Sequence, residues 1–412
     1  MGSVFEVLHF YLIEQFNPFW FVTVVGTGIS STILHSFFYE IDGLRFLSYV
    51  MFGIACNLLV IMLALLFANM LFVCKRESFE SYFNIYFQDS SISVFWGLFP
   101  MGLGVLTNYI FQLCDNELND LQTVRGLVLF VYILWWIDIG LSLTVTWGVT
   151  FLIWRKCSAS VTMENIPAIL LLTVIPSITV SSSGGTFTMS ELLFTATSES
   201  IQTMTLFVTC LIWFSAFLLT IVVLNSYIWN LYVNKIPPFK QVFTIFIQIG
   251  PFGQASFGFL LLTNNIKKYI ELYYPVSEFP PDDRINTLAV ICSFKVCGAL
   301  VALFLIAAGI LFTIISVLSV ISYSFAPSNS SILAFHKGWW AMPFPLGTMA
   351  LATEEFYRQY GQYVSANAFH VLGVIYGFTC SLLTIFCLAA SVVVYSRDIV
   401  TVLNGKKEDE CV

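Results

Sequence analysis

Residues 243–266 read FTIFIQIGPFGQASFGFLLLTNNI and contain no charged side chain. A helix needs about 20 apolar residues to cross the hydrocarbon core of a bilayer, so this stretch is long enough. Gly250-Pro251-Phe252-Gly253 lies within it. A proline inside a helix removes a backbone donor and clashes with an upstream carbonyl, so it bends the helix. The stretch therefore predicts a membrane-crossing helix that bends near its middle.

The composition of the whole chain also indicates a membrane protein. Of its 412 residues, 58% are hydrophobic and 10% are charged, and the mean hydropathy is +0.86. Soluble domains carry about 25% charged residues, so this chain cannot cover a water-exposed surface with polar groups. We expect a single transmembrane domain over residues 1–412. The net charge of −7 gives no reason to expect nucleic-acid binding, which requires basic patches.

Windows with few or no charges follow one another along the chain. They cover residues 15–39, 46–74, 90–114, 126–154, 165–190, 200–234, 241–266, 285–336, 338–353 and 359–396. These ten windows predict an all-α polytopic membrane protein with ten transmembrane helices. An even number of crossings places both termini on the same side of the membrane.

The basic residues of the short loops predict the orientation, because cytoplasmic loops carry an excess of Lys and Arg. The side of the termini has ten of them: Lys75, Arg76, Arg155, Lys156, Lys235, Lys240, Lys337, Arg397, Lys406 and Lys407. The other side has six: Arg45, Arg125, Lys267, Lys268, Arg284 and Arg358. We therefore predict a cytoplasmic N-terminal segment, 1–15, and a cytoplasmic C-terminal tail, 397–412.

The odd-numbered windows differ from the even ones because each carries Gly or Pro near mid-membrane. The residues expected to bend these helices are Gly26, Pro100, Pro176, Pro251, Pro343 and Pro345. The first four are separated by 74, 76 and 75 residues, so the repeating unit is a helical hairpin, present five times. Backbone groups that lose their hydrogen bond at such a bend are tolerated within the bilayer only where they face protein or a water-filled cavity. We therefore expect the odd helices to surround a central pore; the alternative is that Gly and Pro only allow close packing.

Small hydroxyl and amide side chains on the odd helices are candidates for lining this pore. They are Thr27, Ser30, Ser31, Thr107, Asn108, Ser177, Ser181, Ser182, Gln248, Gln254, Ser256 and Thr348. Such a neutral tube can replace part of the hydration shell of an ion without trapping the ion. Each group could instead be satisfied by packing between helices.

Two charges, Asp138 and Lys295, interrupt even-numbered windows. A charge at the centre of a membrane helix costs about 2.5–3.5 kcal/mol on insertion scales, so such residues usually pair or face a cavity. We expect the two to form a structural ion pair or to lie at a subunit contact.

The sequence offers no catalytic centre. The histidines, His9, His35, His336 and His370, are not spaced as metal ligands on a helix. The chain also has no GxxxxGK[ST] phosphate-binding loop. We therefore expect no enzyme activity, no metal and no cofactor.

Several long strings resemble the tellurite-resistance and dicarboxylate transporter superfamily. They include FNPFWFVTVVGTGISSTIL (16–34), FWGLFPMGLG (95–104), VYILWWIDI (131–139), SSSGGTFTMSELLF (181–194) and FHKGWWAMPFPLGTMALATEEFYRQY (335–360). This superfamily includes fungal malate carriers, the slow anion channels of plant guard cells and the fungal sulfite exporters, to which the chain is most similar. The resemblance implies five inner and five outer helices, and a homotrimer with one pore in each subunit. It also implies export of sulfite or bisulfite across the plasma membrane, which confers sulfite resistance.

The resemblance also implies a pore gate. In anion channels of this superfamily, a phenylalanine on the ninth helix plugs the pore in a Trp-Trp-Ala-x-x-Phe-Pro setting. The matching string is 339–345, so Phe344 is the matching residue, although the additional Pro343 could change the local bend. The alternative is that Phe344 is one of 41 phenylalanines and simply packs. The alternative function is that of an anion channel or a dicarboxylate (malate) carrier of the same superfamily. The short loops argue against a receptor or adaptor, which would need an extended cytoplasmic region for its partners.

Overall fold

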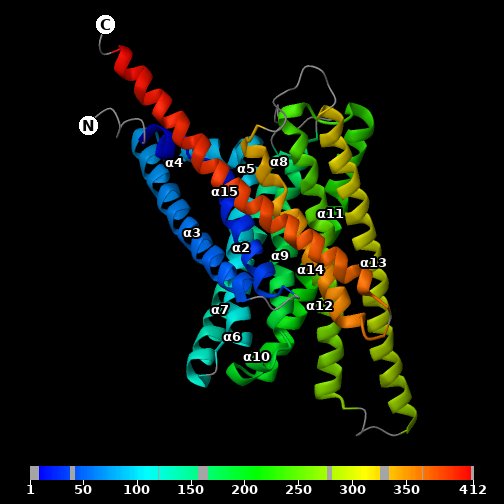
Figure 1. Ribbon diagram of the computed structural model, residues 1–412. Coiled ribbons are helices and arrows are strands. Elements are labelled where there is room, and N and C mark those ends of the chain that lie inside the picture. Colours follow the sequence, from blue (N-terminus) through cyan, green and yellow to red (C-terminus); the bar gives the residue numbers. More distant parts are fainter. Residues whose placement is uncertain are drawn as a thin grey trace.

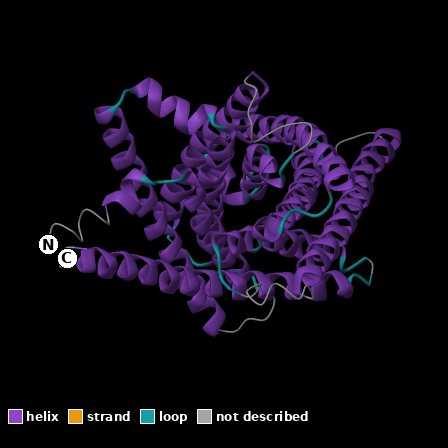
Figure 2. Ribbon diagram, turned by 90° about the horizontal axis from the view of Figure 1, so that it is seen from above, coloured by secondary structure: helices purple, strands orange, loops and turns teal. Residues whose placement is uncertain are grey.

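The computed structural model describes residues 9–37, 42–118, 120–155, 166–275, 281–324, 334–363 and 365–409. Within these residues all regular structure is helical (Figures 1 and 2). The ends of the predicted cytoplasmic segments, 1–8 and 410–412, lie outside the described residues.

Seven of the described helical stretches are long and apolar enough to cross a membrane. They are Gly43–Arg76, Ser90–Asn116, Leu121–Arg155, Glu199–Asn234, Gln241–Tyr273, Ile285–Tyr323 and Asn367–Arg397. The prediction of an all-helical polytopic membrane protein is therefore confirmed. Three further windows hold the shorter helices α2 (Phe21–His35), α9 (Ile175–Phe187) and α14 (Pro343–Tyr360). The count of ten membrane helices stays a prediction.

Each odd-numbered window contains a short 3₁₀ helix followed by an α-helix. The pairs are η2 (Pro18–Trp20) with α2, η4 (Val94–Gly97) with α6 (Leu98–Asn116), η6 (Ala168–Thr173) with α9, η7 (Phe239–Gln248) with α12 (Ile249–Tyr273), and η9 (Lys337–Ala341) with α14. The chain therefore repeats the same local structure five times.

The prolines occupy a different place in these segments from the one the sequence suggested. Pro100, Pro176, Pro251, Pro343 and Pro345 lie in the first turn of an α-helix, directly after the 3₁₀ segment, and not at a bend inside one continuous helix. The first turn has no intrahelical acceptor for its N–H groups, so a missing N–H costs nothing there. Gly26 is the exception, because it lies inside α2, where an added Cβ would come within 3.1 Å of the Trp340 ring.

The five α-helices that follow the 3₁₀ segments form a closed ring. Helix α2 packs against α6, α6 against α9, α9 against α12, α12 against α14, and α14 against α2. Figure 2 views the molecule from above the ring. We call these five helices the ring helices.

Five longer helices cover the ring. Helix α3 (Asp42–Arg76) packs on α2, α7 (Leu121–Leu143) on α6, α11 (Glu199–Asn234) on α9, α13 (Pro281–Ser324) on α12, and α15 (Asn367–Asp409) on α14. We call these the outer helices. Short helices complete the described chain: η1 (Phe10–Glu14), α4 (Phe79–Phe83), η3 (Asn84–Gln88), α5 (Ser90–Ser93), η5 (Thr144–Val149), α8 (Thr150–Arg155) and α10 (Glu191–Ala196).

Glycines allow the ring segments to approach closely. A Cβ on Gly253 of α12 would lie 2.6 Å from the carbonyl carbon of Thr348 on α14. A Cβ on Gly97, just before α6, would collide with the carbonyl oxygen of Leu172 in η6. Close packing is therefore one reason for glycine at these positions. This agrees with the alternative to the pore hypothesis, in which Gly and Pro only allow close packing.

The residues near both ends of the described chain lie at one end of the molecule. The rings of Trp20 and Tyr395 are 4.9 Å apart, and Arg76 forms an ion pair of 3.6 Å with Glu14. Figure 1 shows α4 and the last part of α15 at this end. We call it the terminal end. The far end is the one where α12 and α14 finish, at Tyr273 and Tyr360.

Candidate functional site

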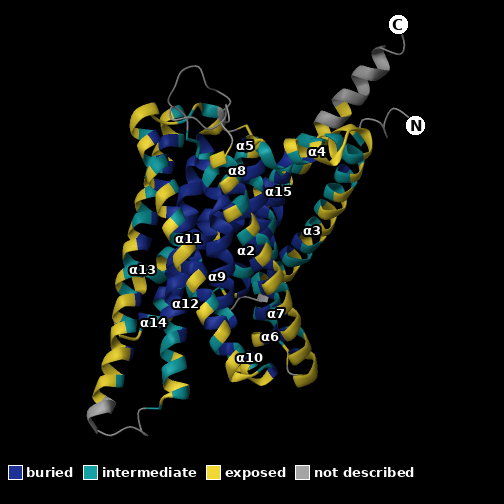
Figure 3. Cartoon of the chain, turned by 180° about the vertical axis from the view of Figure 1, so that it is seen from behind, coloured by how far each residue is buried: buried dark blue, intermediate teal, exposed yellow. Residues whose placement is uncertain are grey.

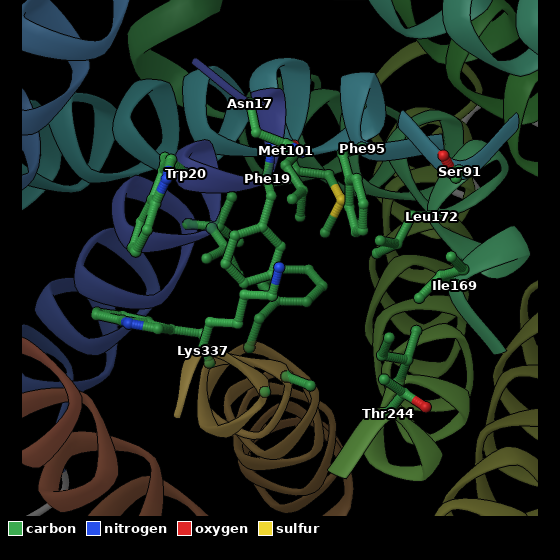
Figure 4. A pocket seen from close by; sticks show the side chains of 18 of the residues that line it. Asn17, Phe19, Trp20, Ser91, Phe95, Met101, Ile169, Leu172, Thr244 and Lys337 are labelled. Atoms are coloured by element: carbon green, nitrogen blue, oxygen red, sulfur yellow. Dashed lines mark hydrogen bonds between the residues drawn. The ribbon is translucent and has the colours of Figure 1, made fainter. Parts of the chain in front are cut away.

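A cavity of about 860 Å³ lies at the terminal end. All five ring segments contribute to its wall through the residues that precede or begin their α-helices. Figure 4 labels some of them: Phe19, Trp20, Phe95, Ile169, Thr244 and Lys337. The cavity is therefore a vestibule that leads toward the centre of the ring.

The wall of the vestibule is mostly apolar and carries one cation. Lys337 is the only charged residue among the described residues that line it. Its Nζ atom lies 5.9 Å from the centre of the Phe19 ring, and Figure 4 shows the side chain reaching toward that ring. The Lys337 side chain is exposed, so its charge is available to attract anions that approach the opening of the vestibule.

Phe344 belongs to the wall of the vestibule. Val25, Met101, Ile175 and Pro345, which are also residues of the ring helices, line it as well. The Phe344 side chain is 5% exposed, and its ring comes within 3.8 Å of the position that a Cβ would take on Gly250. The predicted gate residue therefore lines the vestibule, and its role as a gate stays a prediction. A constriction of apolar side chains blocks ions because they would lose their hydration there.

None of the twelve predicted lining residues borders the vestibule. Several of their hydroxyls donate hydrogen bonds to carbonyls of their own helix. Thr27 donates to Thr23 at 2.7 Å, Ser31 to Gly28 at 2.7 Å and Thr107 to Leu103 at 2.8 Å. Their hydrogen bonds are therefore already made in this conformation.

Other predicted lining hydroxyls bond toward the outer layer. Ser30 donates to Thr384 of α15 at 2.7 Å, and Ser181 donates to the Thr209 carbonyl of α11 at 2.9 Å. Ser256 donates to the Ala302 carbonyl of α13 at 3.3 Å, and Ser177 is 2.7 Å from the Thr146 hydroxyl in η5. These groups join ring helices to the outer layer.

Two hydroxyls connect ring helices to one another. Ser182 lies 3.2 Å from the Gln254 carbonyl, and Thr348 lies 3.3 Å from the Gly250 carbonyl. Both also donate within their own helices. The role of all these hydroxyls in lining a pore stays a prediction.

The amides behave differently from the hydroxyls. Gln248 is fully buried, and neither its Nε2 nor its Oε1 atom has a hydrogen-bond partner within the described part of the chain. The Oδ1 atom of Asn108 also has no hydrogen-bond partner within the described part of the chain. The third amide, Gln254, is buried, with 3% of its surface exposed. An unpaired buried amide costs about 1–3 kcal/mol, so it usually serves a ligand or a water molecule. Gln248 follows Ile247 of the vestibule wall, so it is the strongest of the twelve candidates.

The predicted ion pair between Asp138 and Lys295 is wrong. Asp138 of α7 is buried against α6, where a Cβ on Gly104 would lie 2.8 Å from its Oδ2 atom. Lys295 of α13 lies 3.3 Å from the Tyr363 hydroxyl. Helix α7 packs on α6, and α13 packs on α12. Two charged residues that both lie within membrane-spanning windows therefore need not be neighbours.

Sequence reasoning also missed the aromatic wall of the vestibule. Its signal was nevertheless present, because aromatic pairs occupy the 3₁₀ segments before three ring helices. These are Phe19-Trp20, Phe95-Trp96 and Trp339-Trp340, of which Phe19, Trp20, Phe95 and Trp340 line the vestibule. Aromatic side chains supply large, well-defined apolar surfaces for such a wall.

A family model described as voltage-dependent anion channel matches residues 15–392. The chain belongs to this family. The match includes all ring helices, all residues named above for the vestibule wall, and Phe344. The expected membership of this transporter group is therefore confirmed, and the names in the family are those of channels and transporters rather than enzymes.

Curated members of this family are similar to the chain along most of its length. The sulfite efflux pump SSU1 of Saccharomyces cerevisiae is 43% identical over 406 residues, which cover 94% of this chain and 89% of the relative. The sulfite efflux pump SSU1 of Candida albicans is 29% identical over 396 residues, covering 93% and 75%. The protein of the same name from Arthroderma benhamiae is 27% identical over 380 residues, covering 91% and 90%.

Proposed function

We propose that this chain exports sulfite or bisulfite and thereby protects the cell from it. The choice of cargo rests on the relative from Saccharomyces cerevisiae, which is named a sulfite efflux pump and is 43% identical over 94% of this chain. The path is supported by one structural observation: five buried helices close into a ring, and the described wall of the vestibule includes one cation, Lys337, and Phe344.

The proposed path runs through the ring from the terminal end to the far end. Lys337, the one charged residue of the described wall, draws the anion into the vestibule. Gln248 then offers an unpaired amide that replaces part of the hydration shell. Phe344 blocks the path in the conformation described above, so transport requires this ring to move.

The proposed topology has ten membrane helices in five hairpins within a single domain, 1–412. Each ring helix is paired with the outer helix that follows it in the chain. The terminal end faces the cytoplasm, because the loops on that side have more Lys and Arg than the loops of the far end. The vestibule therefore opens toward the side from which an exporter collects its cargo.

The proposed assembly is a homotrimer in the plasma membrane with one pore in each subunit. The outer helices expose large apolar side chains, such as Phe214, Leu300 and Phe304, which suit either lipid or a neighbouring subunit. Because the ring closes within one chain, each subunit has its own path.

The single charge of the vestibule favours a small, singly charged anion over a dicarboxylate. A carrier for malate must neutralise two carboxylates, and Lys337 is the one charged residue of the described wall. A chloride or nitrate channel would use the same geometry, so the cargo must be tested directly.

Reconstitution of the full chain in liposomes tests this function. The liposomes are loaded separately with labelled sulfite, malate or chloride, and release is measured with and without a proton gradient. We expect sulfite to leave fastest, and unlabelled sulfite to compete with the labelled anion. Equal release from protein-free liposomes would overturn the proposal, and faster release of malate or chloride would assign a different cargo.

A further inference from the structure

A second, smaller cavity lies at the far end of the molecule. It has a volume of about 280 Å³ and lies among the ends of α12 and α14 and the adjacent part of α13. Four of its lining residues are cations: Lys267, Lys268, Lys295 and Arg358. None of the lining residues is acidic. This accumulation of positive charge contrasts with the net charge of −7 of the chain.

Two of the four cations have carboxylate partners nearby. Lys267 lies 3.5 Å from Glu271, and Arg358 lies 2.7 Å from Glu355. For Lys268 and Lys295, the described chain provides no carboxylate within 4 Å, so these two ammonium groups have no ion-pair partner there. The carboxylates of Asp115 and Glu354 act on Arg358 at longer range.

Contacts with the end of α14 and the loop after it hold Lys295 at the cavity. The Tyr360 hydroxyl donates to the Lys295 carbonyl at 2.8 Å, and Lys295 Nζ lies 3.3 Å from the Tyr363 hydroxyl. The same ammonium group is 4.6 Å from the centre of the Tyr363 ring. These contacts orient the ammonium without neutralising it, which gives this intramembrane charge a role that the sequence left open.

The rest of the lining is also polar. It includes the amides of Asn264, Gln359 and Gln362 and the hydroxyls of Tyr360 and Tyr363. Amide N–H and phenol O–H groups beside ammonium and guanidinium groups form charge-assisted hydrogen bonds with oxyanions. Pockets for drug-sized ligands usually start at about 300 Å³, so this cavity suits a smaller group.

We infer that this cavity is an oxyanion-binding site. Its ligand is a small oxyanion, either free sulfite or sulfate or the phosphate of a lipid headgroup. Fourteen residues of α14 separate Phe344 from Arg358, which corresponds to about 21 Å at 1.5 Å per residue. The site therefore lies at the opposite end of α14 from the vestibule. Under the proposed function it lies on the exit side, but binding does not depend on that function.

Binding of sulfate to the full chain in lipid nanodiscs tests this inference. The variant Lys268→Gln/Lys295→Gln removes the two charges that have no ion-pair partner in the described chain. The variant Lys75→Gln/Lys235→Gln is the matched control, because it removes two charges from the terminal end. Sulfate is titrated calorimetrically in discs of neutral lipid, with chloride added to hold the ionic strength constant because salt screens exposed charges.

We expect sulfate to bind the wild type and the control about equally, and to bind Lys268→Gln/Lys295→Gln at least tenfold more weakly. The variant Lys268→Arg/Lys295→Arg should restore binding because it keeps both charges. A Lys337→Gln protein is titrated in parallel, so that binding in the vestibule is separated from binding at the far end. Failure of sulfite export in liposomes would leave this result unaffected.

A second arm identifies the source of the oxyanion. The midpoint of thermal unfolding is measured in discs with and without an anionic phospholipid. Stabilisation of the wild type by that lipid, lost in Lys268→Gln/Lys295→Gln, would support the site with a headgroup phosphate as its ligand. If neither sulfate nor the lipid distinguishes the wild type from this variant, the inference is wrong.

Discussion

Among the seven described stretches that are long and apolar enough to cross a membrane, the most buried one is not the most apolar one. The stretch that includes α12 is entirely buried in its most apolar window and has a mean hydropathy of 1.5, whereas the stretch of α3 is 11% buried and has a mean hydropathy of 2.7. Figure 3 shows exposed residues along α3, α11 and α13 and buried residues in the centre of the molecule. Lipid surrounds the outer helices, so they must be apolar on their outward faces.

The ring helices and the outer helices differ in where polar side chains can be accommodated. A hydroxyl or an amide on a ring helix finds partners on its neighbours, and the ring segments can change from 3₁₀ to α-helix because protein surrounds them. The outer helices α3, α11, α13 and α15 instead run as long regular helices, whereas α7 continues into the π-helix η5. Where lipid covers a helix, each backbone group must bond within that helix. Function is therefore concentrated in the less apolar layer.

The largest expected effect is the loss of the ring itself. Gly97→Ala places a methyl group against the Leu172 carbonyl, which is backbone and cannot turn away. Overpacking of this kind costs about 3 kcal/mol, so we expect little folded protein by size-exclusion chromatography. Gly53→Ala on α3 is the control, because nothing lies within 4 Å of its added Cβ. Equal yields of both variants would contradict the close packing of η4 and η6.

Removal of the Phe344 ring should open the path. We expect Phe344→Ala to increase sulfite release from liposomes several-fold at equal protein amounts, because the apolar constriction becomes wider. Truncation of a buried phenylalanine also lowers the folding stability, so only the folded fraction is compared. Phe304→Ala on α13, where the side chain is 69% exposed, should leave release unchanged. Unchanged release in Phe344→Ala would mean that this residue only packs.

The charge of Lys337 should affect the rate of entry more than the maximum rate. Lys337→Gln removes the only charged group of the described vestibule wall, so we expect about tenfold slower release at low ionic strength and a smaller difference at high salt. Lys75→Gln at the same end is the control for net charge. The salt dependence of release decides this prediction: a defect of equal size at all salt concentrations would argue against electrostatic attraction.

The smallest expected effect concerns Gln248. Gln248→Leu removes two unpaired polar atoms from the ring, so stability should be unchanged or higher by about 1 kcal/mol. Sulfite release should nevertheless fall, because the amide no longer replaces water around the anion. Asn57→Leu on α3 makes the same exchange at an exposed position and should preserve release. A stable Gln248→Leu protein with full release would remove this residue from the path.

Much of the layer structure could be predicted from the sequence. The spacing of charges located the membrane-spanning stretches, and the period of Gly and Pro separated the ring helices from the outer ones. The resemblance supplied Phe344, which the structure places in the wall of the vestibule. The charge spacing, the period of Gly and Pro, and the motif around Phe344 are patterns along one chain, so they can be read directly from the sequence.

The direction of individual side chains could not be predicted. Ser30 and Ser181 were candidates for lining the pore, with packing between helices as the alternative, and the sequence did not indicate that they bond to the outer helices α15 and α11. Asp138 and Lys295 were expected to meet, yet they lie on outer helices that pack on different ring helices. A small polar residue on a buried helix has neighbours on every side, so its position along the chain does not say which neighbour it will bond.

The sequence by itself determined that this protein is a membrane protein built from a repeated helical unit. Length, charge spacing and proline period are one-dimensional properties, and the bilayer converts them directly into helices of a given length. Only the tertiary structure decided that all five ring segments share one vestibule, and that four cations meet at the far end. The residues of each cavity come from several helices, so they come together only when these helices pack.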